Sequence, residues 1–465
     1  MIVGYAIPAV QKFQGAAYKS LYYQALENSK ADGATPDDNP CLIARGDELY
    51  RAGGGAVPSV LIVPQFVKPG AVYTQIPTPT VEAGDFDQFT FTRNTTATRV
   101  NASGLIESVA SGVLRLDYPV TGGCPAALIE PSAQNLVLQS EAWNVSPWAA
   151  TSGSQGATVS GNVTASPDGT TNADKLIESA VTGTHFCLQT LTLTSGTTYT
   201  ASCFVKASER TRGRLRTSGA GAYWDLDFNL TSGTVTGGTN PFIQNYGNGW
   251  YRIGATFTAN QASNNFILFL LDASGNVSYT GDGTSGIFVW GAQIETGAIP
   301  TSYIPTTTAS ATRAAEVCTV SGVSGYIGQT QGTLYLDLSY EQGSSTSNRW
   351  LELFGNSNHI ALAVNSNNNI RSIVNGQSDV LTGTDTRSRY KIAWGYDLSG
   401  VVCFINGTQF TLTNGGAQVI TSLDSFRIDM SSTAGQRVFN NRLRAAAIYT
   451  TRLSNDQLAN LTRLT

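Results

Sequence analysis

Few side chains in this chain of 465 residues could carry acid–base or metal chemistry. Histidine occurs twice, as His185 and His359, which lie far apart in the sequence. Neither belongs to a set of residues at metal-ligand spacing, and a catalytic triad built on either would need partners from distant segments. We therefore predict that both histidines are structural, with hydrogen-bonded rings.

Glycoside hydrolysis is the reaction that the carboxylates could support, because it needs an acid paired with a nucleophile or base. The candidate pairs are Asp225 with Asp227, and Asp337 with Glu341. Asp225 and Asp227 are two residues apart, so in a strand they share one face. Two such neighbours ordinarily point into solvent. We predict no catalytic residues and no enzymatic activity.

Sugar binding requires an exposed aromatic ring and polar side chains beside it. The tryptophans that lie in apolar strand-like runs, and are therefore expected in the core, are Trp224, Trp250 and Trp290. Trp350 follows Asn348 and Arg349 and is the least obviously buried. These three residues, Asn348, Arg349 and Trp350, are our candidate carbohydrate-binding site.

The six cysteines indicate neither a zinc site nor a disulfide scaffold, because they are widely spaced and none forms a C-x-x-C pair. Free buried thiols in a chain folded in a reducing cytoplasm are expected, although Cys187 and Cys203 could face each other across neighbouring strands. Asp424 and Asp429 are possible calcium ligands in loops. The expectation is nevertheless no metal and no cofactor. The cysteines are Cys41, Cys124, Cys187, Cys203, Cys318 and Cys403.

The composition favours β-sandwiches joined by turns. Charged residues make up 13% of the chain, aromatic residues 9%, and there are 48 glycines. A net charge of −4 and a pI near 5.3 argue against nucleic-acid binding, which would need a basic surface. No apolar run is long enough to cross a membrane, and the start lacks the pattern of a signal peptide. We expect no membrane insertion.

Residues 1–58 differ from the rest of the chain. Apolar residues recur at helical spacing over 11–29 and predict one amphipathic helix. One such helix cannot bury its apolar face alone, so it must pack on the chain's own body, on sister copies or on another protein. We predict that 1–58 is a helical anchor for sister copies or a partner. Residues 59–138, with short strands and several prolines, are predicted to form an extended strand-and-turn connector.

Two β-sandwiches are predicted to follow, over 139–313 and 314–465. The strand-like runs of the first include 198–206, 223–229, 250–258, 265–272 and 287–294. In the second, Leu334, Leu336 and Leu338 alternate with polar residues. Asn406-Gly407 predicts a type I′ hairpin, and Ser454 with Gln457 predicts a capping box before a short helix. The fold class is mainly β: a short helical N-terminal anchor and two antiparallel, jelly-roll-like β-sandwiches.

The connector resembles a segment found in structural proteins of tailed bacteriophages, particularly viruses of gut Bacteroidetes. Several motifs occur in the same order over some sixty residues: Asp87 with Phe89 and Phe91, Arg93-Asn94, Thr96-Ala97-Thr98-Arg99-Val100-Asn101, Gly104 to Glu107, Arg115 to Tyr118, and Ala127 to Pro131 with Asn135-Leu136. The sequence Ala311-Thr312-Arg313 repeats the Ala97-Thr98-Arg99 pattern after the first sandwich. The repeat predicts two similar joints, one on each side of that domain.

Each sandwich has a resemblance of its own. The first is similar to carbohydrate-binding-module-like jelly rolls of phage appendage proteins, on Glu141-Ala142-Trp143, Gly249-Trp250-Tyr251-Arg252 and Trp290-Gly291-Ala292-Gln293-Ile294-Glu295. The second resembles the laminin-G/concanavalin-like sandwich, on the hairpin over 401–407 and on Ala447-Ile448-Tyr449.

These resemblances imply a structural and adhesive virion protein, a head fibre or tail appendage assembled in the host cytoplasm. Its expected partners are other virion proteins bound through 1–58, sister copies in a homo-oligomer (a trimer is favoured), and cell-surface glycans. The alternatives are a tailspike-type glycan depolymerase and a structural spacer without ligand. The regular short repeat of the β-helix common in such depolymerases is absent from the sequence.

Overall fold

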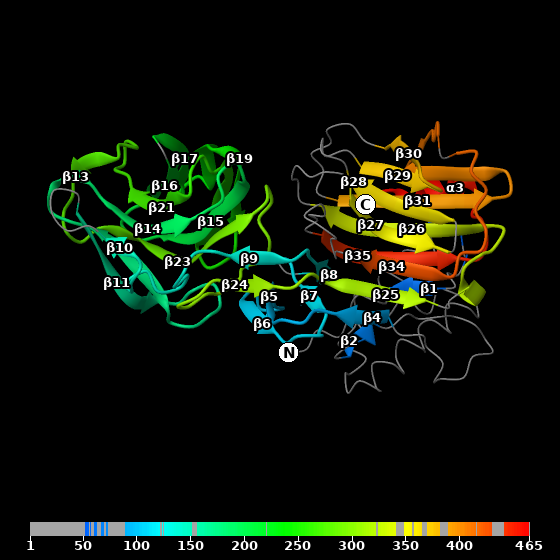
Figure 1. Ribbon diagram of the computed structural model, residues 1–465, viewed down its shortest axis with the longest axis horizontal. Coiled ribbons are helices and arrows are strands. Elements are labelled where there is room, and N and C mark those ends of the chain that lie inside the picture. The colour runs from blue at the N-terminus through cyan, green and yellow to red at the C-terminus, as the bar shows by residue number, and fades with distance from the viewer. Residues whose placement is uncertain are drawn as a thin grey trace, which may run out of the picture.

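The computed structural model describes residues 89–120, 125–150, 156–219, 221–321, 324–340, 348–355, 358–364, 370–381, 389–414, 416–429 and 441–464, with Gly123 and short stretches between 52 and 72. The predicted helical anchor over 1–58 lies almost entirely outside these residues. The predicted fold class, mainly β with two antiparallel sandwiches, is confirmed (Figure 1). Within the described residues, no helix is long and apolar enough to span a membrane.

Two six-stranded antiparallel sheets form the first sandwich. The first sheet consists of β10 (Ala149–Ala150), β14 (Phe186–Thr192), β21 (Ser263–Leu270), β16 (Arg212–Gly219), β17 (Ala222–Asn229) and β18 (Thr234–Gly237), in this order. The second consists of β11 (Ala157–Thr164), β12 (Ala173–Glu178), β23 (Gly286–Thr296), β15 (Thr198–Ala207), β20 (Trp250–Thr258) and β19 (Thr239–Asn245). A small ribbon of β13 (Thr182–Thr184) and β22 (Ser278–Thr280) extends from one end.

An eight-stranded and a nine-stranded sheet form the C-terminal sandwich. The eight-stranded sheet has the order β33 (Thr408–Phe410), β32 (Gly400–Ile405), β31 (Arg389–Asp397), β26 (Gly332–Tyr340), β35 (Asn441–Tyr449), β8 (Ala126–Ile129) and β7 (Arg115–Asp117), with β1 (Val60–Ile62) also on β35. The nine-stranded sheet has the order β2 (Val67–Lys68), β3 (Ala71–Val72), β4 (Phe89–Thr92), β25 (Val317–Ser321), β34 (Ser425–Asp429), β27 (Asn348–Phe354), β28 (His359–Val364), β29 (Ile370–Val374) and β30 (Gln377–Val380).

The connector is therefore built into the C-terminal sandwich. Its strands β7 and β8 lengthen one sheet beyond β35, and β4 pairs with β25 in the other. Its remaining elements lie between the two sandwiches: the hairpin of β5 (Ala97–Val100) and β6 (Ile106–Val109), and the ribbon of β9 (Ala133–Asn135) with β24 (Ala311–Arg313) (Figure 1). Domain boundaries at 58, 138 and 313 stay predictions.

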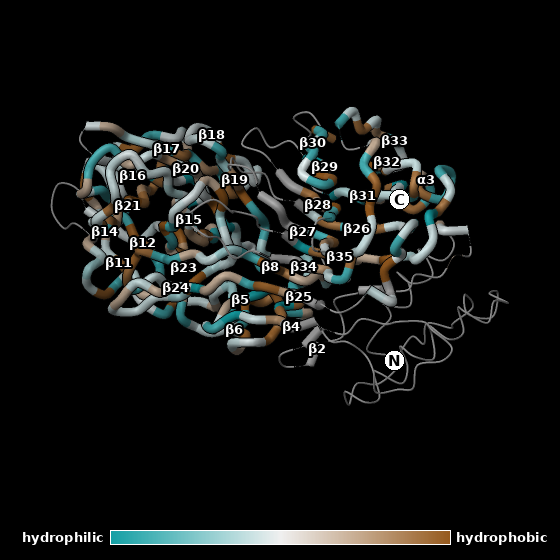
Figure 2. The backbone as a smooth tube through the Cα atoms, turned by 45° about the vertical axis from the view of Figure 1, so that its right-hand side comes forward, coloured by the Kyte–Doolittle hydropathy of each residue, from teal (hydrophilic) through white to brown (hydrophobic). Residues whose placement is uncertain are grey.

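Apolar residues that alternate along the strands fill both cores. Figure 2 shows where apolar residues lie along these strands. Leu334, Leu336 and Leu338 lie in the core of the C-terminal sandwich, as predicted. On the other side of β26, Tyr335 packs under α3 (Asn455–Thr462) with Leu458 and other apolar residues.

Two local predictions in the C-terminal sandwich are confirmed. Asn406 and Gly407 have φ angles of 50° and 86°, the left-handed backbone that a type I′ hairpin needs. Ser454 and Gln457 form the capping box of α3. A short 3₁₀ turn, η3 (Ser324–Tyr326), precedes β26.

The connector contacts the outer face of the second sheet of the first sandwich through β6. Phe204, Trp250 and Trp290 are buried on this face and form one cluster with Ile106 of β6 and with Tyr303. Ile106 thus gives the connector an apolar contact with these buried rings. The first sheet of that sandwich is consequently the one that points away from the connector.

Candidate functional site

Arg115, the first residue of β7, is the centre of a buried ion network. Its side chain is fully buried and contacts two carboxylates. Nε donates to Glu316 Oε1 at 2.8 Å and Nη2 to Glu316 Oε2 at 2.5 Å, which is a two-point contact. Nη2 also lies 2.8 Å from Glu130 Oε2.

Two further arginines complete the network. Arg93, directly after β4, donates to Glu316 Oε1 at 2.6 Å. Arg313, the last residue of β24, donates to Glu130 Oε2 at 2.5 Å. All of these side chains are at most 1% exposed. The network therefore joins the connector to the segments that leave the first sandwich and enter the C-terminal one.

Ser302 ties the end of the first sandwich to the same carboxylate. Its backbone N–H and its hydroxyl donate to the two oxygens of Glu130 at 2.8 and 2.6 Å. The hydroxyl also accepts from Arg115 Nη1 at 2.7 Å and Arg313 Nη1 at 2.9 Å. Glu130 thus receives donors from both sides of the junction.

Three guanidinium groups face two carboxylates, so one positive charge needs other acceptors. Backbone carbonyl oxygens supply them: Arg93 donates to those of Thr95, Val113 and Ala110, and Arg313 to that of Pro131. Most polar atoms of the network therefore have hydrogen-bond partners, although Nε of Arg313 has none.

The Glu130 carboxylate is held ionised by the arginines beside it. Burial alone would raise the pKa of Glu130, but Arg313 and Arg115 lower it to about 2. Burial would lower the pKa of Arg115, and Glu316 with Glu130 raises it above its ordinary value. A carboxylate with such a low pKa is unsuited to act as a general acid.

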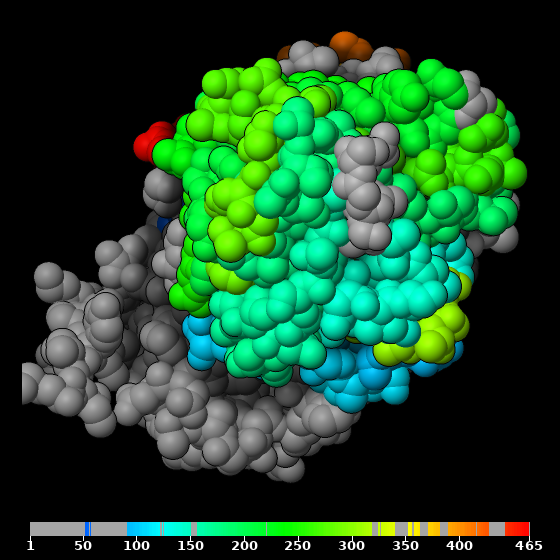
Figure 3. Space-filling model, turned by 90° about the vertical axis from the view of Figure 1, so that its left-hand side faces the viewer, coloured from blue at the N-terminus to red at the C-terminus, as the bar shows by residue number. Residues whose placement is uncertain are grey.

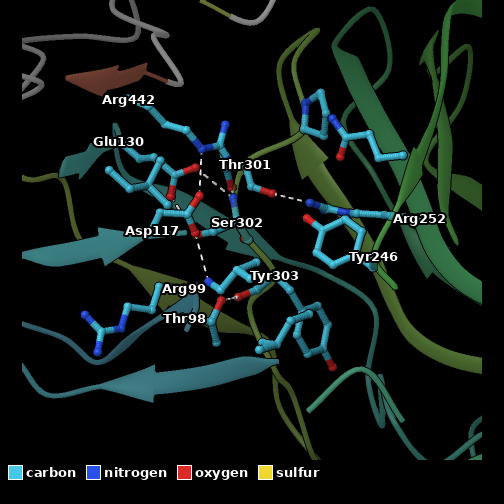
Figure 4. Close-up of a pocket in the computed structure, with 15 residues that line it drawn as sticks. Thr98, Arg99, Asp117, Glu130, Tyr246, Arg252, Thr301, Ser302, Tyr303 and Arg442 are labelled. Atoms are coloured by element: carbon cyan, nitrogen blue, oxygen red, sulfur yellow. Dashed lines mark hydrogen bonds and ion pairs between the residues drawn. The ribbon is translucent and has the colours of Figure 1, made fainter. Parts of the chain in front are cut away.

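A cleft lies beside this network, between the hairpin β5–β6 and the edge of the first sandwich (Figure 4). It measures about 410 Å³ including its open mouth. Its lining is mostly polar and comes from both sides of the junction: Thr98, Arg99, Val100, Ile106, Asp117, Leu128, Glu130, Gln244, Tyr246, Arg252, Pro300, Thr301, Ser302, Tyr303 and Arg442.

Most polar groups of the cleft are engaged with one another. Asp117 accepts from the Val100 N–H at 2.8 Å and from Arg442 Nε at 2.6 Å (Figure 4). Arg252, 3% exposed, donates to the Thr301 carbonyl at 2.7 Å and to the Ser202 hydroxyl at 3.1 Å, whereas its Nε has no hydrogen-bond partner. These hydrogen bonds tie the connector to Arg442 of β35 and hold the end of the first sandwich at the cleft.

The predicted carbohydrate site stays a prediction. Asn348, Arg349 and Trp350 occupy the start of β27, and their side chains lie outside the described residues. Of the tryptophans expected in the core, Trp250 and Trp290 are 1% exposed, which confirms the prediction. Trp224 is half-buried and packs against the core.

The carboxylates considered for hydrolysis are tied to arginines. Asp225 receives both Nε and Nη2 of Arg216 at 2.6 and 2.7 Å, and Asp227 receives Nε and Nη2 of Arg214 at 2.5 and 2.8 Å. Asp337 forms the same two-point contact with Arg389. Glu341, its suggested partner, lies outside the described residues.

Both histidine rings are hydrogen-bonded, as predicted. The ring of His185 is fully buried, with Nδ1 2.5 Å from the Gly156 carbonyl oxygen. Nε2 of His359 accepts from the Gly376 N–H at 3.2 Å.

The described cysteines, Cys187, Cys203, Cys318 and Cys403, are free and buried; Cys41 and Cys124 are outside the described residues. Within the described part of the chain no three His, Cys, Asp or Glu residues gather as a metal site. Of the suggested calcium ligands, Asp424 accepts from the Ser425 hydroxyl, and the side chain of Asp429 lies outside the described residues.

The sequence motifs did not predict the ion network. A usable signal was present for three of the five residues, because each of them directly adjoins an apolar residue: Leu114 precedes Arg115, Ile129 precedes Glu130, and Val317 follows Glu316. The repeated Ala-Thr-Arg pattern predicts two similar joints, whereas in the structure both copies lie at one junction. Arg313 enters the network, and Thr98 donates to the Tyr303 carbonyl at 2.5 Å.

No protein-family model matches the sequence, and no curated protein matches it. Solved structures align with parts of the chain. The receptor binding domain of botulinum neurotoxin mosaic serotype C/D aligns at 12% identity and a TM-score of 0.26, over 31% of this chain and 38% of that chain. The Ruminococcus gnavus IT-sialidase CBM40 bound to α2,3 sialyllactose aligns at 13% identity and 0.23, over 30% and 84%.

Domain 4 of AbnA, a GH43 extracellular arabinanase from Geobacillus stearothermophilus in complex with arabinotriose, aligns at 16% identity and a TM-score of 0.25, over 36% of this chain and 82% of that chain. Each of these alignments covers about a third of this chain and assigns no ligand to it.

Proposed function

We propose that this chain is a structural and adhesive component of a tailed-phage virion, a head fibre or tail appendage that holds two β-sandwiches in a fixed relation and presents them to glycans. The observation that carries the proposal is the buried contact of Arg115 with Glu130 and Glu316 at the junction. It serves no evident catalytic step, and it fixes the connector between the two sandwiches.

The connector motifs that resemble phage structural proteins supply most of this network. Arg93, Arg115 and Glu130 are motif residues, and Asp117 of the same motif binds Arg442 of the C-terminal sandwich. The motifs thus have a physical reason for their residue types: each places a charged group at a strand end inside the junction. A segment whose task is to hold two display domains would need such groups.

A fixed junction suits multivalent display. Weak sites gain avidity when several copies are presented together, provided that the geometry lets them bind at once. On this proposal residues 1–58 attach the chain to the capsid, portal or tail, sister copies associate as a trimer, and the two sandwiches project outward. The chain carries out no catalysis itself.

Two experiments test the proposal. Virions labelled at Thr465 and imaged by electron microscopy should show the label at a regular position on the particle; particles without label would contradict the virion role. Deletion of residues 1–50 should abolish incorporation while the sandwiches still fold. A truncated chain that still joins particles would contradict the assignment of the anchor.

Adhesion is tested by a glycan array together with an assay of reducing-sugar release from host capsule. Binding without release is the expected result. Release of reducing sugar would replace the adhesive role by a depolymerase.

A further inference from the structure

Tyr223 is the one aromatic side chain counted among the large, exposed apolar side chains of the described residues, with 63% exposure. It lies near the start of β17, where residues alternate between the core and the outer face of the sheet. Trp224, Leu226 and Phe228 point inward to the core, so Tyr223, Asp225 and Asp227 point outward. An aromatic ring left in water does not contribute the stabilising free energy that its burial would provide.

The ring of Tyr223 is oriented by Arg216. The Arg216 guanidinium carbon lies 4.5 Å from the Tyr223 ring centroid and 5.1 Å from that of Phe269. Asp225 fixes this guanidinium through both carboxylate oxygens, at 2.6 and 2.7 Å. Arg216 therefore covers one face of the ring, and the large exposure of Tyr223 leaves the opposite face to solvent.

A row of hydroxyl and amide groups crosses the sheet at the level of Tyr223. Tyr223 is paired with Ser218, Ser218 with Asn265, and Asn265 with Thr190. The Thr190 hydroxyl donates to Asn265 Oδ1 at 2.8 Å, and Asn265 Nδ2 donates to the Ser218 hydroxyl at 3.4 Å, which places these side chains on one face. Adjacent strands are about 4.8 Å apart, so the row reaches about 14 Å from Tyr223.

The charges beside Tyr223 compensate one another. Arg216 is paired with Asp225 and Arg214 with Asp227, and Arg214 also lies 3.1 Å from Asp225. A ligand here would meet an aromatic face and neutral donors and acceptors, with no uncompensated charge. Uncharged sugar rings fit this chemistry, because their C–H face stacks on an aromatic ring and their hydroxyls both donate and accept hydrogen bonds.

The face is also accessible in the fold. The connector contacts the outer face of the other sheet of the first sandwich, so the sheet that carries Tyr223 is turned away from it. Seen from the end opposite the C-terminal sandwich, the first sandwich fills most of the view (Figure 3).

We infer that the outer face of the sheet formed by β14, β21, β16 and β17 is a binding surface for neutral glycans, on which a pyranose ring stacks on Tyr223 and sugar hydroxyls bind Asn265 and Thr190, while Ser218, which is buried, holds Asn265 in place. The inference rests on the adhesive part of the proposed function and assigns it to a site. It places the ligand on the first sandwich, at a residue other than Trp350.

The test is an array of neutral and acidic oligosaccharides, followed by affinity measurements on the best neutral probe with the full chain. Tyr223→Ala should weaken binding by about tenfold, Tyr223→Trp should keep it, and neither should change the melting temperature because the ring is exposed. Arg212→Gln is the matched control, because Arg212 lies on the outer side of neighbouring β16 about 20 Å along the strand, and it should bind as the wild type does. Raising the ionic strength from about 0.05 to about 0.5 M should leave the affinity within about twofold.

The outcomes separate this site from the general role. If the wild-type chain binds glycans and Tyr223→Ala binds equally well, the site is wrong while the adhesive role stands, and loss of binding in Trp350→Ala would move the site to β27. If the wild-type chain binds acidic glycans alone, the assignment to neutral sugars is wrong. If it binds no glycan, both the site and the adhesive role are wrong.

Discussion

Arg115 Nη2 lies 2.5 Å from Glu316 Oε2, and both side chains are fully buried although the whole first sandwich lies between them in the sequence. Glu316 also accepts from the Glu130 N–H at 2.8 Å, and the Glu316 N–H donates to the Glu130 carbonyl at 3.0 Å. After the connector the chain forms the whole first sandwich, and it then returns so that Glu316 lies within hydrogen-bond distance of Glu130.

Removing the Glu316 carboxylate should destabilise the protein strongly. Glu316→Ala leaves the Arg93 and Arg115 guanidiniums buried without their main partner, which costs about 3–5 kcal/mol of unfolding free energy. Urea denaturation measures this value. Glu107→Ala is the control, because Glu107 pairs with Arg99 at the partly exposed β5–β6 hairpin and should lose at most about 1 kcal/mol. Equal losses in the two variants would contradict the role of the buried network.

Acid should weaken the junction in a defined pH range. The pKa of Glu130 is about 2 in the folded protein and 4.5 in the unfolded chain, so the unfolded state binds more protons between these values. The stability that Glu130 contributes is complete above about pH 4.5 and is lost as the pH falls toward 2.

Urea midpoints measured between pH 6 and 2.5 check this expectation, with Glu130→Gln as the comparison. The variant should be less stable at neutral pH and should show a shallower loss on acidification. Glu295 acts in the opposite direction, because burial raises its pKa and protonation in acid therefore favours the folded state. A variant with the same acid dependence as the wild type would show that Glu130 does not carry it.

The four described cysteines should not react in the native protein. Burial raises the pKa of the Cys187 thiol to about 12, and it also raises those of Cys203, Cys318 and Cys403. A Cys41→Ser/Cys124→Ser variant treated with a thiol reagent should release almost no signal until denaturant is added, when four thiols react. Two reactive thiols after denaturation would instead indicate a disulfide.

The periodicity of apolar residues predicted the strands of the sandwiches well, because these strands are long and each buries one face. The run over 198–206 corresponds to β15, that over 250–258 to β20, and that over 287–294 to β23. Successive side chains of each strand point alternately to the core and to the outer face, so apolar and polar residues alternate in the sequence.

The junction was not predictable in the same way. Its five charged residues come from strand ends that are up to 223 positions apart, and no local pattern pairs Arg93 with Glu316. The resemblance identified the connector residues as a motif. Their role became clear only from the structure, which shows the ion pairs that they form. The outward position of Tyr223, in contrast, was predictable. Neighbouring residues of a strand point to opposite faces, so the prediction that Trp224 lies in the core implies that Tyr223 points outward.

The most direct measurement of the central claim is the distance distribution between the two sandwiches, obtained by pulsed electron spin resonance. Spin labels would replace Val163 of β11 and Leu398 of the C-terminal sandwich, which are 42% and 66% exposed, in the Cys41→Ser/Cys124→Ser background. A fixed junction predicts one narrow distance peak, which broadens in Glu316→Ala. A broad distribution in the protein with an intact network would contradict the account.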